Sequence, residues 1–406
     1  MPSTHLPSLL FHRGNRWQGM LRGSTNILAQ HFLQAGYPVT WLGRPYHAGH
    51  VLFQKNNSHG YRFGSRVERS SDGALEILPF TLAPIIKSAR LGARVWAQSA
   101  RLGYQTICPS LPRLMAEASQ PSPRIIWSTG GDADGLLRTF PDAKRIVQCV
   151  DVYEAYAGPA QNLLEQHDYR DADAIVAIGE ALARYLVRER QVPRDKITVI
   201  GQGADLELFA TLKPEPPEVA NCLRPRLIWV GLLEKADATL MEAALAALPN
   251  GEGSLVLLGP EAEWARRLAT HDQRVHVIGP RSASVVAACL QHADVGLMLY
   301  DRKRDPRQYE GQNPLKLYEM AAAGLPIIST SHEEYRYGTN PALIADTTEE
   351  VAAAMHNALG LRDKLACASR EFAGANGWSA RFVQARALVH ALLEDHAPAR
   401  LTARAV

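Results

Sequence analysis

Short apolar runs alternate with amphipathic stretches along this chain, and this alternation constrains the fold more than any other feature. Runs of four or five apolar residues predict buried strands, and apolar residues recurring every three or four positions predict helices. The predicted strands are 9–11, 39–42, 124–127, 146–150, 174–178, 226–230, 255–258, 275–278, 295–299 and 326–329. Helices are expected at 25–35, 133–139, 180–190 and 378–393. Strands that alternate with helices are typical of an α/β protein with parallel sheets covered by helices.

The pattern stops and restarts near residue 210, which predicts two domains. A chain of 406 residues is too long for one ordinary core. The Pro-rich, charged segment 212–218 suits a linker between them. We therefore predict two Rossmann-like domains facing each other across a cleft, with ligands at the carboxyl ends of their strands. The predicted bounds are 1–210, 211–375, a helix 376–395 that packs back toward the first domain, and a tail 396–406.

Composition excludes several functional classes. The net charge of +3 is too small to indicate nucleic-acid binding. No apolar run is long enough for a membrane span, and the first residues lack the features of a signal peptide, so a cytoplasmic location is expected. The five cysteines show no zinc-like spacing. Asp132–Asp134 and Asp171–Asp173 are Asp-x-Asp matches, which we interpret as a helix cap and a turn rather than a metal site. No metal or other cofactor is expected.

The most specific stretch is QNPLKLYEMAAAGLPII, residues 312–328. Asn313 suits an N-cap and Pro314 the first helical turn, while Gly324 suits the helix end. A helix N-terminus with free N–H groups favours a phosphate. Lys316 is one turn in and adds a full positive charge, and Glu319 follows on the same face, where it can accept hydrogen bonds from sugar hydroxyls. The pattern predicts a site for a phosphate beside the hydroxyls of a sugar or a ribose.

This motif resembles the donor-site helix of the GT-B glycosyltransferases. The segments LIWVGLLEK, LVLLGP, VHVIGP and ADVGLMLY are similar in layout to the strand ends that line the nucleotide in that family. The resemblance therefore implies a nucleotide-sugar donor as the substrate. It implies donor contacts from Gly231, Leu232, Lys235, Gly279, Pro280, Arg281, Asn313, Pro314, Lys316 and Glu319.

Within the family the chain resembles the xanthan-type glucuronosyltransferases of bacterial exopolysaccharide assembly. The cues are a lysine eight residues before Gly324, an aspartate after the strand 146–150, and EYRYG at 334–338. Those enzymes are inverting, metal-independent and associated with the inner membrane. The resemblance implies that Asp151 is the catalytic base, with Glu154 as a weaker alternative. It also implies a loop toward the donor phosphates and the acceptor, from which we select Arg22, Ser24 and Thr25.

The expected function is transfer of a sugar, with glucuronate as the first candidate, from a UDP-sugar to a lipid-linked or other glycan acceptor. Three alternatives stay open at this point: a retaining transferase that uses a donor such as GDP-mannose, a sugar-nucleotide epimerase or hydrolase, and an inactive nucleotide-binding module. Many retaining members carry two glutamates with seven residues between them. Here Gly311 occupies the position that pairs with Glu319, and Glu310 is one residue away. A dehydrogenase is disfavoured because no GxGxxG joins a first strand to a helix.

One segment suggests contact with a membrane surface. Residues 82–105 contain four basic residues and no acidic one, and Ile86, Val95, Trp96 and Leu102 can share part of an apolar face. The basic residues are Lys87, Arg90, Arg94 and Arg101. A basic amphipathic helix of this kind suits an anionic membrane surface, and an ordinary helix packed on the first domain remains the alternative. We therefore also expect a peripheral position on the inner face of the membrane.

Overall fold

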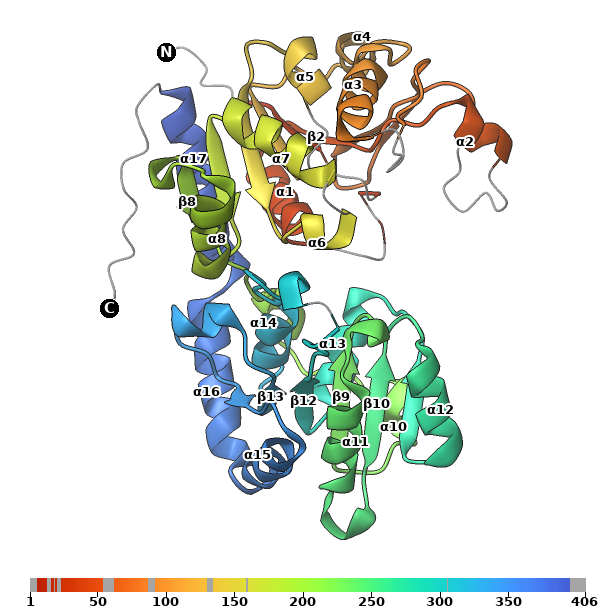
Figure 1. Cartoon of the computed structure of the whole chain (residues 1–406), viewed down its shortest axis with the longest axis vertical. Coiled ribbons are helices and arrows are strands. Elements are labelled where there is room, and N and C mark those ends of the chain that lie inside the picture. Colours follow the sequence, from red (N-terminus) through yellow and green to blue (C-terminus); the bar gives the residue numbers. More distant parts are fainter. Residues whose placement is uncertain are drawn as a thin grey trace. The chain divides into compact units, whose positions relative to one another are not determined.

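The computed structural model describes residues 6–12, 16–17, 19, 23–53, 62–86, 92–129, 134–157, 160–304 and 306–394, and it divides the chain into two compact units (Figure 1). Unit 1 comprises Met1–Gly201 together with Phe382–Val406, and unit 2 comprises Gln202–Arg381. Each unit is built on its own sheet, so the prediction of two α/β domains with parallel sheets is confirmed.

The sheet of unit 1 has eight strands in the order β3-β4-β2-β1-β5-β6-β7-β8. The strands are β1 Leu9–His12, β2 Val39–Leu42, β3 Arg66–Arg69, β4 Leu75–Leu78, β5 Ile125–Thr129, β6 Lys144–Cys149, β7 Ala174–Ala177 and β8 Ile197–Val199. All neighbours pair in parallel except β3, which runs antiparallel to β4. Except for the edge strand β8, the parallel strands are buried on both faces, as continuous apolar runs predict.

Helices cover both faces of this sheet. They are α1 Ser24–Gln34, α2 Ala48–Phe53, α3 Gly92–Gln105, α4 Leu111–Glu117, α5 Asp134–Thr139, α6 Glu154–Ala157, α7 Ala160–Asp171 and α8 Glu180–Arg190. On one face Phe11 stacks between Trp41 and Trp127, with centroid distances of 6.4 and 5.7 Å. On the other face Leu10 and Ile126 pack in the cluster that contains residues of α4 and α5. This alternation along the strands gives unit 1 two apolar layers.

Unit 2 contains a six-stranded parallel sheet in the order β11-β10-β9-β12-β13-β14. Its strands are β9 Arg226–Val230, β10 Ser254–Leu258, β11 Val275–Ile278, β12 Val295–Met298, β13 Ile327–Ser329 and β14 Leu343–Ile344. Its helices are α9 Leu206–Phe209, α10 Pro217–Ala220, α11 Ala238–Ala246, α12 Glu263–His271, α13 Ala283–Gln291, α14 Leu315–Ala322, α15 Thr348–Gly360 and α16 Arg362–Ala375.

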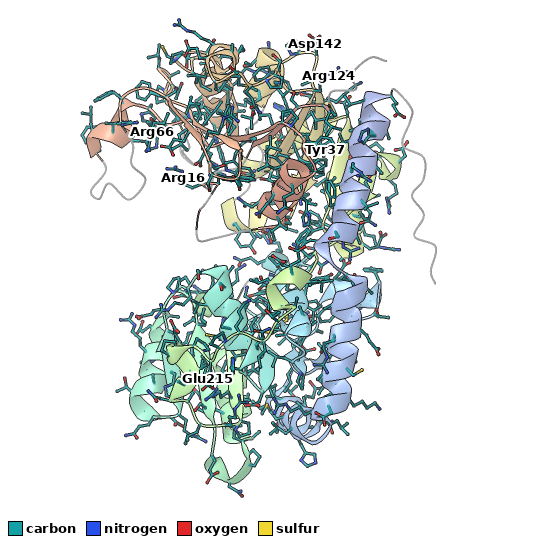
Figure 2. All side chains as sticks on the ribbon, turned by 180° about the vertical axis from the view of Figure 1, so that it is seen from behind. Arg16, Tyr37, Arg66, Arg124, Asp142 and Glu215 are labelled. Carbon is teal, nitrogen blue, oxygen red and sulfur yellow. The ribbon has the colours of Figure 1, made fainter. Side chains whose placement is uncertain are left out.

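The last described helix, α17 Trp378–Leu393, belongs to both units. Its first turn stays with unit 2, where Trp378 packs against the Gly203 backbone. From Phe382 onward it packs on unit 1, where Phe382 meets Phe32 of α1 edge to face at 5.0 Å. Farther along, His390 Nε2 lies 2.8 Å from the hydroxyl of Tyr37, which Figure 2 shows beside this helix.

Both boundaries between the two units differ from the predicted ones. The chain leaves unit 1 after Gly201 and returns at Phe382, whereas we predicted boundaries at 210 and 376. Residues after Gln202 belong to unit 2 because Ala204 pairs with Gly377 in a short β-bridge. Sequence composition could not indicate this, because a single bridge leaves no periodic pattern.

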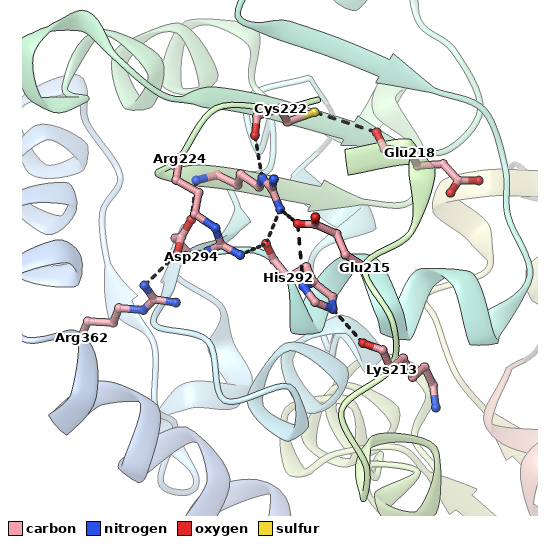
Figure 3. Close-up of polar contacts among 9 residues, drawn as sticks. Lys213, Glu215, Glu218, Cys222, Arg224, His292, Asp294 and Arg362 are labelled. Carbon is pink, nitrogen blue, oxygen red and sulfur yellow. Dashed lines mark hydrogen bonds and ion pairs between the residues drawn. The ribbon is translucent and has the colours of Figure 1, made fainter. Parts of the chain in front are cut away.

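The Pro-rich segment 212–218 is docked on unit 2 and is not a free linker (Figure 3). Glu215 accepts a hydrogen bond from the buried Arg226 at the start of β9. The carbonyl of Lys213 lies 2.8 Å from His292 Nε2. These ionic and polar contacts hold the segment at the amino end of β9, and proline content alone does not reveal them.

Within the described part of the chain, no helix combines the length and the apolar character needed to cross a membrane.

Candidate functional site

The motif helix α14 begins one residue later than predicted. Pro314 is its N-cap, without a side-chain cap, so Asn313 stands outside the helix. The buried Asn313 accepts a hydrogen bond of 3.0 Å from the Tyr318 hydroxyl instead of capping. The C-terminus matches the prediction: Gly324 has φ +74°, and the N–H groups of Gly324 and Leu325 return to the carbonyls of Ala321 and Met320.

The side chain of Lys316 lies directly over the end of strand β9. A Cβ added to Gly231 would come within 2.2 Å of Lys316 Cε and 2.5 Å of its Nζ, and Gly231 has φ +125°. Only glycine fits here, because both the space and the backbone conformation exclude a side chain. Among the described residues the Lys316 ammonium makes no hydrogen bond. An anionic group at the end of β9 could therefore accept one from it.

Each of the three neighbouring strands β9, β10 and β11 is followed directly by a glycine. The Gly231 N–H donates to the Leu258 carbonyl, and the Gly259 N–H donates to the Ile278 carbonyl, both at 2.8 Å. A Cβ on Gly259 would lie 1.9 Å from the Gly231 oxygen, so the backbones approach as closely as glycine permits. Gly279 follows the third strand, β11. Gly259 was absent from the predicted site, although Gly-Pro follows both β10 and β11 and repeats the same signal.

Glu319 lies one turn after Lys316, and the two side chains influence each other's ionisation. Removal from water raises the pKa of Glu319, and Lys316 opposes that rise. Removal from water also lowers the pKa of Lys316, and Glu319 opposes this fall. Asp205, which caps α9, adds negative potential that raises the Glu319 pKa further. Asp205 was not predicted near the motif helix, because more than one hundred positions separate it from Glu319.

The residues after β9 form a short turn that pairs with the loop after β12. The Lys235 carbonyl accepts a hydrogen bond of 2.9 Å from the Asp301 N–H, and Ala236 bridges Tyr300. Arg304, in the loop after β12, donates a hydrogen bond of 3.0 Å to the Glu234 carboxylate. The side chain of Leu232 is 49% exposed. The predicted donor loop is therefore held by backbone pairing, with its exposed side chain available for contacts.

Arg281 points back toward its own strand end. Its guanidinium donates to Glu218 at 2.8 Å and to the Pro280 carbonyl at 3.1 Å. This hydrogen bond with Arg281 lowers the pKa of Glu218. The arrangement makes Arg281 a tether for α10, and leaves the exposed Pro280 and the Gly279 backbone as the groups at this strand end.

In unit 1, Asp151 follows the carboxyl end of β6 by two residues and is half-buried. The carbonyl of Asp151 accepts a hydrogen bond from the Cys149 thiol at 3.4 Å. Burial raises the pKa of the Cys149 thiol to about 12, which keeps the thiol proton in place as a donor. Glu154, the alternative base, is bound by Arg190 at 2.8 Å.

The loop expected to face the donor phosphates does not present its hydroxyls. Gly23, and not Ser24 or Thr25, is the N-cap of α1. Ser24 and Thr25 are buried and bind Gln148 of β6, at 3.2 and 2.8 Å. Gln148 also accepts from the Trp127 indole at 2.9 Å. These hydroxyls anchor α1 to the sheet, a role that depends on the distant Gln148.

The structure describes only some of the other residues of that loop. Arg22 lies outside the described residues. Arg16 is described, and it binds Glu76 at 2.9 Å and Glu68 at 2.8 Å, so its charge is neutralised within unit 1 (Figure 2). At the end of β1, His12 Nε2 lies 2.5 Å from the Tyr104 hydroxyl, a contact that the sequence did not indicate.

The two Asp-x-Asp matches are partly described. Asp173 accepts a hydrogen bond of 2.7 Å from the Arg145 N–H, and Asp171 binds Arg170 at 2.7 Å. Asp132 and the side chain of Asp134 lie outside the described residues. Among the residues that the structure describes, no group of three His, Cys, Asp or Glu side chains is arranged to hold a metal ion.

Two family models match this chain. The model described as "Glycosyl transferases group 1" matches residues 224–360, and "Glycosyltransferase Family 4" matches residues 136–208. The first region contains the glycine-ended strands and α14, and the second contains Asp151. These two matches relate the chain to the GT-B glycosyltransferases over residues 136–208 and 224–360.

Solved structures support the GT-B fold over nearly the whole chain. Sucrose-phosphate synthase from Thermosynechococcus elongatus is similar with a TM-score of 0.68 and 17% identity, covering 96% of this chain and 99% of that one. HepE from Anabaena, solved in complex with UDP, is similar with a TM-score of 0.59 and 13% identity, covering 95% of this chain and 100% of that one. At these identities the likeness establishes the fold alone.

A curated relative adds a biological context. TuaH of Bacillus subtilis strain 168, provisionally described as a teichuronic acid biosynthesis glycosyltransferase, is 23% identical over 242 residues. The match covers 55% of this GT-B chain and 60% of TuaH, so the two align over little more than half their lengths.

Proposed function

We propose that this GT-B protein transfers a sugar, with glucuronate as the first candidate, from a UDP-sugar to a lipid-linked or other glycan acceptor in polysaccharide biosynthesis. The observation that carries the proposal is the Lys316 ammonium over the Gly231 backbone. A cation above a glycine-ended strand suits a diphosphate, because the missing side chain lets the phosphate oxygens come close to the main chain and to the ammonium together.

The ionisation of Lys316 and Glu319 also supports the assignment of this strand end as a diphosphate site. Lys316 is held partly out of water, and this lowers its pKa although Glu319 opposes the fall. A bound diphosphate adds negative charge and stabilises the ammonium. As the glycosidic bond to the leaving UDP breaks, negative charge grows on the diphosphate, and Lys316 is placed to stabilise it. Glu319 is then free to accept hydrogen bonds from hydroxyls of the nucleotide sugar.

Inverting transfer additionally needs a base for the acceptor hydroxyl. We assign this role to Asp151, because it follows the carboxyl end of β6, and ligands of open α/β sheets bind at the carboxyl ends of the strands. HepE is solved with UDP, and TuaH is described in teichuronic acid biosynthesis. By similarity these names favour a UDP-sugar and a role in glycan assembly for this chain.

A lipid-linked acceptor would bring unit 1 to an anionic membrane surface. The segment 82–105 presents exposed Leu82 and Leu102, and Arg94 of α3 is also exposed. Trp96 is buried against Leu164 of α7, so this part of the predicted apolar face is wrong. Lys87 and Arg90 lie outside the described residues. The membrane contact that we propose therefore uses the exposed leucines and basic residues without Trp96.

The donor site is tested by calorimetric titration with UDP, GDP and their sugars. UDP should bind, and Lys316→Ala and Glu319→Ala should each weaken it by about tenfold or more, since a charged hydrogen bond is worth roughly 1.5–3 kcal/mol. Lys364→Ala, an exposed lysine on α16, is the matched control and should bind as the wild type does. Unchanged UDP affinity in both site variants would remove the donor-site assignment, and a preference for GDP would favour another donor.

A further inference from the structure

The loop that carries Asp151 is anchored through the short helix behind it. Val152 is buried in the apolar cluster around β6 and β7, and α6 begins two residues later at Glu154. Figure 1 places α6 next to α7 in unit 1. Any change in the position of α6 therefore moves the main chain that presents Asp151.

Arg190, the last residue of α8, holds this helix. Its guanidinium binds Glu154 at 2.8 Å and lies 3.5 Å from Glu165 of α7. It also lies over the Tyr185 ring at 5.1 Å. The Arg190 side chain is 9% exposed and that of Glu165 is 4% exposed. One buried cation thus joins α6, α7 and α8.

A second buried contact reaches the same loop from β6. The Tyr169 hydroxyl donates to Cys149 Sγ at 3.3 Å, and the Cys149 thiol donates to the Asp151 carbonyl. These two hydrogen bonds hold the Asp151 main chain at one end of the loop, and the Arg190–Glu154 ion pair holds the other end. Only two residues, Val152 and Tyr153, lie between the two anchored positions.

We propose that Arg190 is a positioning residue for sugar transfer, which through Glu154 sets the place of Asp151. The proposal rests on the proposed role of Asp151 as base. Arg190 itself takes no proton and touches no substrate in this account. Displacing a reacting group by about 1 Å can cost on the order of 10²-fold in rate, so loss of this anchor should lower kcat.

The test compares Arg190→Gln, Arg190→Lys and Asp151→Asn with Arg188→Gln in the purified full chain. Arg188 is an exposed arginine on the same helix, paired with its neighbour Glu189, and it is the matched control. Arg190→Gln should lower kcat by about 10–100-fold while KM for the UDP-sugar and UDP affinity stay within about twofold of wild type. Arg190→Lys keeps the charge and should recover part of kcat.

Activity of Arg190→Gln equal to that of Arg188→Gln, in an enzyme that Asp151→Asn inactivates, overturns the positioning role and leaves the proposed function intact. Full activity of Asp151→Asn instead removes the proposed base itself. If Arg190→Gln does not fold, as judged by its thermal transition, Glu154→Gln takes its place. A several-fold loss of kcat with unchanged UDP affinity supports the tether. Unchanged kcat overturns it, as does a loss as large as that of Asp151→Asn, which would make Glu154 the base.

Discussion

Glu165 should make the stability of unit 1 depend on pH. Its side chain is almost completely buried on α7, and burial raises its pKa from 4.5 to about 7, with Arg190 opposing the rise. Nearby Asp168 and Glu154 raise it further. Glu165→Gln keeps the shape of the side chain and removes the ionisation.

The size of the effect follows from the two pKa values. The folded protein holds the Glu165 proton more tightly than the unfolded chain, so the associated stability is complete below about pH 4.5 and is lost as pH rises through 7. One pKa unit corresponds to about 1.4 kcal/mol, so the whole loss is about 3 kcal/mol. Most of it, about 2–3 kcal/mol, falls between about pH 5 and pH 8. Removing the carboxyl should remove this decline.

Urea unfolding at pH 5 and pH 8, followed by tryptophan fluorescence, measures the decline directly. Wild type should lose about 2–3 kcal/mol more than Glu165→Gln between the two pH values. Glu189→Gln, an exposed glutamate on the neighbouring helix, should follow the wild type. Parallel pH dependence of wild type and Glu165→Gln would refute the assignment of a raised pKa to this carboxyl.

Three further outcomes are expected. Gly259→Ala should lower UDP affinity at least tenfold in calorimetry, because its Cβ would collide with the neighbouring strand, whereas Gly338→Ala, which has open space, should bind normally. Asp294→Ala should destabilise the protein by about 1–3 kcal/mol in urea, since Asp294 accepts the buried N–H at the start of β9, and exposed Asp363→Ala should not. Replacing the four basic residues of segment 82–105 with Gln should abolish salt-sensitive retention by anionic vesicles; equal retention by neutral vesicles would contradict the membrane contact.

The sequence predicted the central strands well because these are buried on both faces. Strand β9 and helix α8 have the predicted bounds. Strand β3 was missed because it lies at the sheet edge, where exposure breaks the apolar run, and the buried β4 was missed because Glu76 interrupts its apolar residues. The turn Asp72-Gly73 between them is a hairpin signal that could have revealed the antiparallel pair.

The donor motif was predictable because its chemistry is local. Lys316 and Glu319 share one helix face, and Gly231 follows a strand directly. The errors concern long-range contacts. Serine and threonine are common helix caps, and this led to the prediction for Ser24 and Thr25. Their hydroxyls instead form hydrogen bonds with Gln148, on a strand more than one hundred positions away. Hydrogen bonds between residues so far apart in the sequence depend on the tertiary structure, and local sequence patterns do not reveal them.

The most direct test of the proposed function is the acceptor-dependent formation of a glycoside, analysed by NMR for its anomeric configuration. With a UDP-sugar and a lipid-linked acceptor, wild type should give a product of configuration opposite to that of the donor. Asp151→Asn should slow its formation by roughly 10²–10⁴-fold with UDP affinity nearly unchanged. A retained configuration would contradict the inverting mechanism. UDP release or sugar epimerisation without any acceptor would contradict glycosyl transfer itself, and UDP binding without turnover of any donor would leave a nucleotide-binding module.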